Sequence, residues 1–187
     1  MKAEEACREI HQILLAAPTF SSPKDIPFEN GLYFFYETGE TSIHGPMGRI
    51  VRIGNHPRSD DRLGPRLTAH YSGQKNSSVF RKHLGGALLR QRDPMHPCLQ
   101  PLPGKGHWEK QNAPHCEMCR PIEKAVSERL RTEFRFKLIE IRDRVERNRF
   151  ETLLIASVSQ CKHCVPSENW LGQFSVLLRL RVVDYGT

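Results

Sequence analysis

Apolar residues recur at helical spacing in three parts of the chain. Over residues 3–17 they fall three and four positions apart, which predicts an amphipathic helix that ends before the next proline. Pro121 is expected to open a second helix, over 121–133, because proline is tolerated in a first helical turn. Asp143, with a glutamate three positions later, resembles a capping box and predicts a third helix over 143–159.

Three other segments have the composition of strands. Residues 31–36 are aromatic and bulky, residues 49–54 follow after a glycine-containing loop, and residues 134–141 alternate in polarity. The first two segments predict a hairpin, and two shorter helices, over 65–71 and 80–89, are expected after it. The predicted fold class is α+β, with a small mixed or antiparallel three-stranded sheet flanked by helices.

Prolines and glycines suggest how the chain is divided. Residues 1–26 are expected to form an N-terminal helix and linker, and residues 27–175 the main domain. Within that domain, the proline-rich and glycine-rich pattern predicts an irregular insertion at 91–120. The apolar end of the chain, 176–187, is expected to be a tail.

Composition excludes several classes of protein. The chain has 187 residues, 38% of them hydrophobic, which is enough to bury a core. Its longest apolar runs are far shorter than the roughly 18–20 residues that a membrane span requires. The first residues are acidic and polar, unlike a signal peptide. We therefore expect a soluble, cytoplasmic protein without a membrane partner.

The positive charge is concentrated in one segment. The chain carries a net charge of +7, whereas residues 49–92 alone contain ten basic and two acidic residues, a balance of +8. A localised basic segment favours a polyanionic partner, with nucleic acid ahead of an acidic membrane surface. The alternative is a solvated basic face that binds no partner.

Four of the six cysteines form two Cys-x-x-Cys pairs. Two intervening residues allow both thiolates of a pair to face one ion, and two such pairs can complete a tetrahedral structural zinc site. The alternative is four thiols that bind no metal. The predicted ligands are Cys116, Cys119, Cys161 and Cys164, and the neighbouring His115 and His163 could substitute for them. Such a site would tie the insertion to the segment after the third helix.

An ordered set of motifs resembles the GIY-YIG endonuclease superfamily. The first strand begins Gly-Leu-Tyr, ending in Tyr33, and the second ends Arg-Ile-Gly, beginning with Arg52. A helix with Arg66 and His70 follows, and Glu151 lies in a later helix. The resemblance covers about residues 31–172 and is nearest to a bacterial branch of the superfamily.

This resemblance implies a divalent-metal-dependent DNA endonuclease. In the family's pattern Tyr33 positions or deprotonates the attacking water, and Arg66 holds the nonbridging phosphate oxygens. His70 assists proton transfer or contacts the phosphate. Glu151 ligates the catalytic cation, and its carboxylate suits Mg²⁺ or Mn²⁺. The polar side chain of Asn169 is expected to help order the site.

The sequence departs from the family's pattern in both triplets. Leu32 replaces isoleucine, a mild change, but Arg52 stands where the second triplet has tyrosine. Arg52 either holds a phosphate or marks a protein that binds without cutting, and we favour the first because the other expected site residues are present. Further contacts with the DNA backbone are expected from Lys75, Arg81 and Lys82.

Two other functions remain open at this point. One is a zinc-stabilised nucleic-acid-binding module without hydrolytic activity, and the other is an interaction protein with an incidental basic face. Each candidate residue also has an ordinary interpretation, as a core aromatic for Tyr33, a solvated side chain for Glu151 and a turn residue for Asn169.

Overall fold

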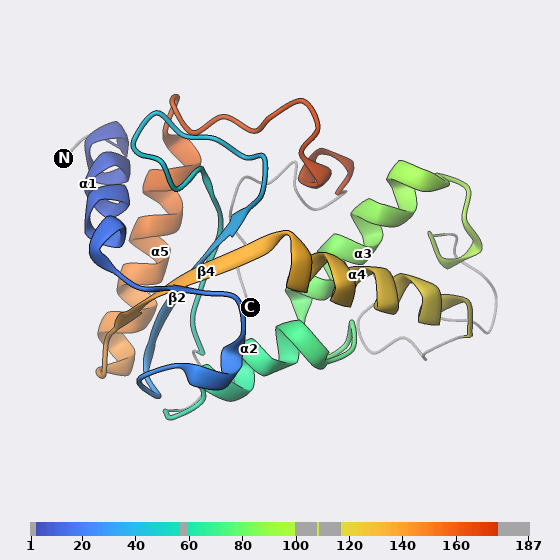
Figure 1. Ribbon diagram of the computed structural model, residues 1–187, viewed down its shortest axis with the longest axis horizontal. Coiled ribbons are helices and arrows are strands. Elements are labelled where there is room, and N and C mark those ends of the chain that lie inside the picture. The colour runs from blue at the N-terminus through green and yellow to red at the C-terminus, as the bar shows by residue number, and fades with distance from the viewer. Residues whose placement is uncertain (1–2, 57–59, 100–107, 109–116, 176–187) are drawn as a thin grey trace. The chain divides into compact units, whose positions relative to one another are not determined.

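The computed structural model describes residues 3–56, 60–99, 108 and 117–175 (Figure 1). These residues fall into two compact units. The sheet unit comprises the described residues within 1–67 and 133–168, and the helical unit those within 68–132 and 169–175. Helix α2 (Leu63–Ser72) begins in the first unit and ends in the second.

The sheet is antiparallel and has the strand order β1-β4-β2-β3. Strands β2 (Gly31–Glu37), β3 (Ile50–Gly54) and β4 (Phe134–Glu140) match the three predicted strands. The sheet has a fourth strand, β1 (Thr19–Phe20), which the sequence placed in the linker. Two residues are too few to show an alternating pattern, so pairing with β4 rather than local sequence creates this strand. The α+β prediction is confirmed.

One face of the sheet packs against two helices, α1 (Ala3–Ala16) and α5 (Arg144–Gln160), seen side by side in Figure 1. Even-numbered residues of β2, from Leu32 to Tyr36, point to this face. They form one buried cluster with apolar residues of both helices, among them Ile10, Leu14, Ile155 and Val158.

The other face of the sheet carries an aromatic layer. Phe35 meets Phe136 and Phe134 at ring-centroid distances of 5.5 and 6.2 Å, and Phe20 of β1 stacks on Phe136. Every residue of β2 is buried, because this central strand is covered on both faces. That explains why its sequence reads as a continuous bulky run instead of an alternating one.

Local capping sets the start of α5. The carboxylate of Asp143 accepts a hydrogen bond from the backbone N–H of Glu146 at 2.8 Å, as the capping pattern predicted. Within the first turn, the fully buried Arg147 donates to the carbonyls of Ile141 and Arg142 and to the carboxylate of Asp60.

A buried lysine donates hydrogen bonds to backbone carbonyls at the C-terminal end of α1. Lys137 of β4 donates from Nζ to the carbonyls of Leu14 and Ala17, both at 2.6 Å. Lys137→Met is expected to lower the free energy of unfolding by about 1–3 kcal/mol, since buried carbonyls lose their donor. Urea unfolding measures this, with the exposed Lys24→Met as control. Equal stability of the two variants would contradict the capping role.

The helical unit is built around α3 (Val79–Arg92), which packs against α4 (Arg120–Thr132). Ser78 caps α3 by accepting a hydrogen bond from the N–H of Arg81 at 3.1 Å. Much of the predicted insertion, 91–120, lies outside the described residues. The described part of the chain also has four short 3-10 helices, η1 (Pro23–Asp25), η2 (Pro97–Leu99), η3 (Glu117–Cys119) and η4 (Leu171–Phe174).

Candidate functional site

The two sequence triplets meet at one end of the sheet. Tyr33 of β2 pairs with Gly54 of β3, so the last residue of one triplet lies opposite the last residue of the other. A Cβ atom at Gly54 would overlap the ring and hydroxyl of Tyr33, which occupy that space. Tyr33 is fully buried, and its ring meets Phe35 edge-on at 5.6 Å. Position 54 therefore has to be glycine for the Tyr33 side chain to occupy its place.

Arg52 lies beside this tyrosine. It pairs with Phe35, which puts it on the same face of the sheet as Tyr33 and diagonally across the strand pair from it. Its side chain is half-buried. The residue that departs from the family's pattern thus stands next to the predicted catalytic phenol.

Two buried polar residues follow β3 directly. Asn55 donates from Nδ2 to Oδ1 of Asn148 in α5 at 2.9 Å, and His56 accepts at Nε2 from the backbone N–H of Gly31 at 3.4 Å. They fix the end of β3 to α5 and to the start of β2. Sequence reasoning missed them, although a polar pair just after a buried strand was a signal for them.

Glu151 lies on α5 one turn after Asn148 and is half-buried. Helix α5 packs against the Leu32 face of the sheet, whereas Tyr33 points to the opposite face. The structure therefore does not bring Tyr33 and Glu151 onto the same face. The two residues lie on opposite faces of the sheet at the same end. Asn55, which follows β3, connects this end to the helix of Glu151 through its hydrogen bond to Asn148.

The first turns of α2 are anchored at this end as well. The N–H of Leu63 donates to the carbonyl of Glu29 at 3.1 Å, and Asn30 and Asp61 bond each other just before β2 and α2. Arg66 is half-buried, and its Nε is buried without a hydrogen-bond partner among the described residues. An unused guanidinium donor suits a phosphate oxygen.

Comparison with known protein families supports the resemblance to the GIY-YIG superfamily. A family model described as the GIY-YIG domain matches residues 15–185, which is most of the chain. The chain belongs to the GIY-YIG domain family. This family is associated with endonucleases, which supports a nuclease-type function and a nucleic-acid substrate. No curated protein and no solved structure matches the chain significantly. Among the described helices of this GIY-YIG protein, none has the length and apolarity of a membrane span.

His70, the second predicted residue of α2, is engaged inside the helical unit. It is fully buried, its Nδ1 lies 2.7 Å from Oγ of Ser78, and its ring meets Phe80 edge-on. Asn169 is exposed in the turn before η4. Neither environment identifies a bound substrate.

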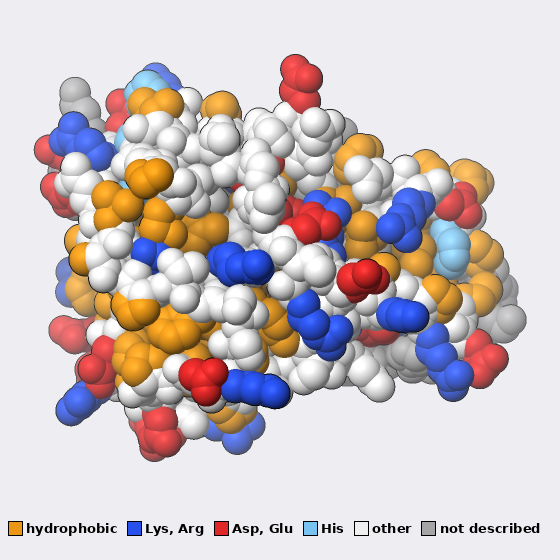
Figure 2. Space-filling view, viewed as in Figure 1, with side chains coloured by type: hydrophobic (Ala, Val, Ile, Leu, Met, Phe, Trp, Pro, Cys, Tyr) orange, Lys and Arg blue, Asp and Glu red, His pale blue; other side chains and the backbone are white. Residues whose placement is uncertain are grey.

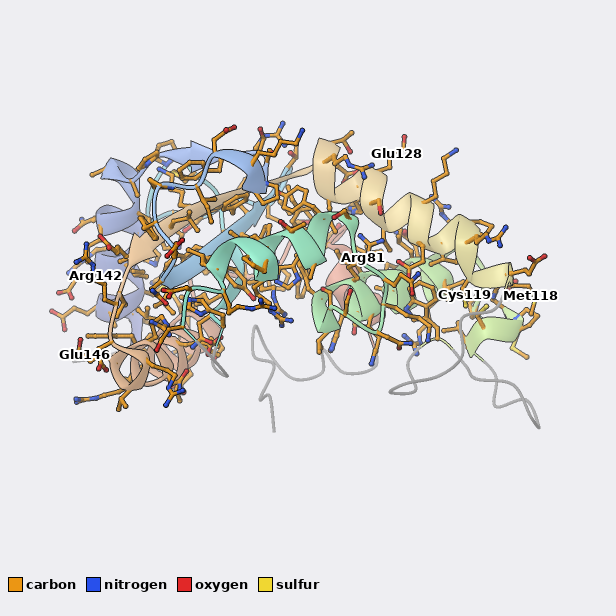
Figure 3. The ribbon with its side chains drawn as sticks, turned by 90° about the horizontal axis from the view of Figure 1, so that it is seen from below. Arg81, Met118, Cys119, Glu128, Arg142 and Glu146 are labelled. Atoms are coloured by element: carbon orange, nitrogen blue, oxygen red, sulfur yellow. The ribbon has the colours of Figure 1, made fainter. Side chains whose placement is uncertain are left out.

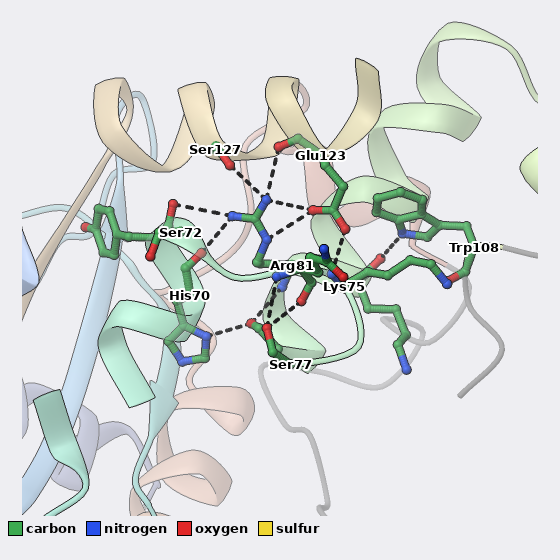
Figure 4. Close-up of polar contacts among 12 residues, drawn as sticks. His70, Ser72, Lys75, Ser77, Arg81, Trp108, Glu123 and Ser127 are labelled. Atoms are coloured by element: carbon green, nitrogen blue, oxygen red, sulfur yellow. Dashed lines mark hydrogen bonds and ion pairs between the residues drawn. The ribbon is translucent and has the colours of Figure 1, made fainter. Parts of the chain in front are cut away.

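The basic residues expected on the DNA are also inside the helical unit (Figure 4). Arg81, 1% exposed, donates to the carboxylate of Glu123 at 2.7 Å, to the carbonyl of His70 and to Ser127. Nζ of Lys75 donates to the carbonyl of Trp108 at 3.1 Å. Lys82 is buried as well. Arg81 and Lys75 are enclosed by these partners, and we propose a structural role for them in place of the expected contacts with the DNA backbone.

The surface is accordingly less basic than the sequence suggests. Four of the nine basic residues that the structure describes in segment 49–92 are buried, namely Arg49, Lys75, Arg81 and Lys82. Figure 2 shows one face of the molecule, on which Lys and Arg side chains are interspersed with Asp and Glu. The segment's charge balance does not translate directly into a basic patch.

A cysteine–histidine cluster lies elsewhere in the sheet unit of this GIY-YIG domain. It comprises Cys7 of α1, His44 of the β2–β3 loop, Cys161 at the end of α5 and Cys164, and one ligand atom of each lies within 4.8 Å of the others. Sγ of Cys7 is 3.6 Å from Sγ of Cys164, and Nε2 of His44 is 3.2 Å from Sγ of Cys161. These residues could hold a metal ion.

Hydrogen bonds within the cluster shift the pKa values of Cys7 and Cys164 in opposite directions. The hydrogen bond between the sulfurs of Cys7 and Cys164, together with those that join Cys164 to His11 and Ser42, lowers the pKa of the Cys164 thiol to about 3. The same bond raises the pKa of Cys7 well above its usual range. Burial lowers the pKa of His44.

Two of the four zinc ligands predicted from the sequence belong to this cluster. Cys161 and Cys164 gather there with Cys7 and His44, which the sequence did not suggest as ligands. Cys119 is buried at the end of η3, directly before α4 (Figure 3), with its Sγ 3.8 Å from that of Cys98. Cys116 lies outside the described residues. The Cys-x-x-Cys spacing identifies two thiols for one ion, but tertiary packing decides which other groups join them.

Proposed function

We propose that this GIY-YIG domain is a divalent-metal-dependent DNA endonuclease that hydrolyses phosphodiester bonds. One observation carries the proposal: the two triplets of the family's pattern meet at the end of the sheet where β2 begins and β3 ends. Tyr33 lies over Gly54 with Arg52 beside it, while Asn55 ties the same strand end to the helix of Glu151.

Each residue has a role that its environment supports. Arg66 holds the nonbridging phosphate oxygens with its guanidinium, whose Nε has no partner among the described residues, and Arg52 supplies a second fixed cation beside Tyr33. Tyr33 positions or deprotonates the attacking water. Because Tyr33 is fully buried, the proposal requires its hydroxyl to become accessible when DNA binds. His70 holds the second half of α2 in place through Ser78.

The donors near Glu151 fit a hard cation. Glu151 offers a carboxylate, and Oδ1 of the buried Asn55 has no hydrogen-bond partner among the described residues. Oxygen ligands of this kind suit Mg²⁺ or Mn²⁺. When bound, such an ion would stabilise negative charge on the phosphate. Asn55 and Asn148 orient this part of α5.

Glu151→Gln tests the proposal because it removes the charge and keeps the shape. Wild-type protein is expected to nick or linearise supercoiled plasmid with Mg²⁺ or Mn²⁺ and to stop on addition of EDTA. Glu151→Gln should cleave at least about 100-fold more slowly, the scale for loss of one key electrostatic group, and still bind DNA. Glu146→Gln, at an exposed position of the same helix, is the matched control and should cleave normally.

A second function is favoured by Arg52 itself. A fixed cation in place of a phenol suits a module that binds nucleic acid without hydrolysis. Salt-dependent DNA binding with intact plasmid in every metal tested would establish this alternative and reject the nuclease. Equal cleavage by Glu151→Gln and wild type would reject the role of Glu151.

A further inference from the structure

We propose that Cys7, His44, Cys161 and Cys164 bind one structural Zn²⁺ ion, which ties α1 to the rest of the sheet unit. This ligand set is independent of the proposed nuclease residues. It also differs from the pairing that the sequence suggested, because Cys7 and His44 replace Cys116 and Cys119.

The spacing of the ligand atoms is close to that of an occupied site. Zinc–sulfur bonds of about 2.3 Å and zinc–nitrogen bonds of about 2.0–2.1 Å place tetrahedral ligand atoms about 3.6–3.8 Å apart. The Cys7 and Cys164 sulfurs are 3.6 Å apart, and the contact of His44 with Cys161 is 3.2 Å. All four ligand atoms lie within 4.8 Å of one another, so adjustments of at most about 1 Å would bring them to the spacing of an occupied site.

The chemistry of the donors selects the metal. Three thiols and one imidazole form a soft, closed set that favours zinc over the hard cations expected at Glu151. Four protein ligands leave no open position for a substrate, so the ion would be structural. The three cysteines are buried in the apolar cluster with Ile10 and Leu14, where an ion would have little access to water.

The loop that carries His44 is held in place without metal. Glu40 and Arg49 form a buried ion pair of 2.6 Å across its base, with side chains 3% and 1% exposed. The Glu40 carboxylate also accepts from the hydroxyl of Ser167, three residues after Cys164. The loop and the turn after α5 are thus already joined beside the cluster, which lowers the ordering cost of binding an ion.

Outer contacts support the sulfur ligands. His11 and Ser42 lie 3.5 and 3.2 Å from Sγ of Cys164, and His11 is almost fully buried. Partners of this kind orient metal ligands and stabilise their charge. The ion would join three segments far apart in the sequence, α1, the β2–β3 loop and the end of the helix that carries Glu151.

Metal analysis of the full-length chain, purified under reducing conditions without an affinity metal, tests the site. We expect one zinc per chain in the wild type and background zinc in Cys161→Ser. Because that variant could fail to fold, His44→Ala is measured as well, since His44 is only half-buried in a loop. It should fold and release zinc to a chromogenic chelator at least about tenfold faster, in line with the 10–100-fold effects of milder changes around metal sites.

Two matched variants exclude the competing ligand sets. Cys119→Ser and His163→Ala should both retain zinc, although the first removes a predicted ligand and the second an exposed histidine next to Cys164. Zinc lost in Cys119→Ser but retained in His44→Ala would overturn the proposal, as would background zinc in a folded wild type with freely titratable thiols. Glu151→Gln should keep its zinc, so failure of the nuclease proposal would be seen separately.

Discussion

Gly54→Ala is expected to reduce both stability and DNA cleavage. The added Cβ would occupy the space of the Tyr33 hydroxyl and ring, and Tyr33 is fully buried, so the ring has to move against its neighbours. Overpacking of this kind costs about 1–3 kcal/mol. A displaced phenol also loses its position for catalysis, and we expect cleavage to fall about 100-fold or more, the lower range for a positioned acid–base group. Urea unfolding and plasmid cleavage measure the two effects.

A double variant shows whether the overlap with Tyr33 is the cause. Tyr33→Leu removes the ring atoms that the new Cβ would meet, so Gly54→Ala should destabilise a Tyr33→Leu protein less than the wild type. The coupling is expected within the 0.5–3 kcal/mol range of contacting residues, at about 1 kcal/mol or more. Gly64→Ala in α2 is the control, since only Ile26 at 3.3 Å needs to adjust. Strict additivity of the first two substitutions would contradict the packing argument.

The part of the site that the sequence predicted depends on neighbouring strands. The first triplet begins one strand of a hairpin and the second ends the other, so antiparallel pairing brings Tyr33 to Gly54 with few long-range contacts. The third helix was predictable for a similar reason, because the Asp143 cap lies within its own sequence. Local patterns of this kind determine an element before the rest of the chain packs.

The cysteine ligands could not be predicted in the same way. Cys7 occupies a buried position of an amphipathic helix, where a cysteine is indistinguishable from an ordinary core residue. It meets Cys164 across 157 positions of sequence, and the contact arises only because α1 packs against α5. Sequence spacing identified the Cys161–Cys164 pair, whereas helix packing selected its companions.

Buried cations explain the difference between sequence charge and surface charge. A count of basic residues in a segment treats every side chain as solvated. Glu123 lies 42 positions after Arg81, yet it neutralises that guanidinium inside the helical unit. We therefore propose Arg52 and Arg66, which are half-buried at the end of the sheet, as the contacts with DNA.

Arg81→Met should destabilise the protein by about 3–5 kcal/mol, the cost of leaving one partner of a buried ion pair unpaired. Arg81 is 1% exposed and Glu123 12%, so the carboxylate would keep little hydration, and three backbone carbonyls and Ser127 would lose a donor. The exposed Arg92→Met on the same helix should change stability by less than about 0.5 kcal/mol. Replacing both partners, in Arg81→Met/Glu123→Met, should recover part of the loss.

This folded double variant also decides between the two roles of Arg81, a contact with DNA phosphate or a purely structural ion pair. A phosphate contact would lower the slope of log K against log salt by about 1, whereas an enclosed arginine leaves that slope unchanged.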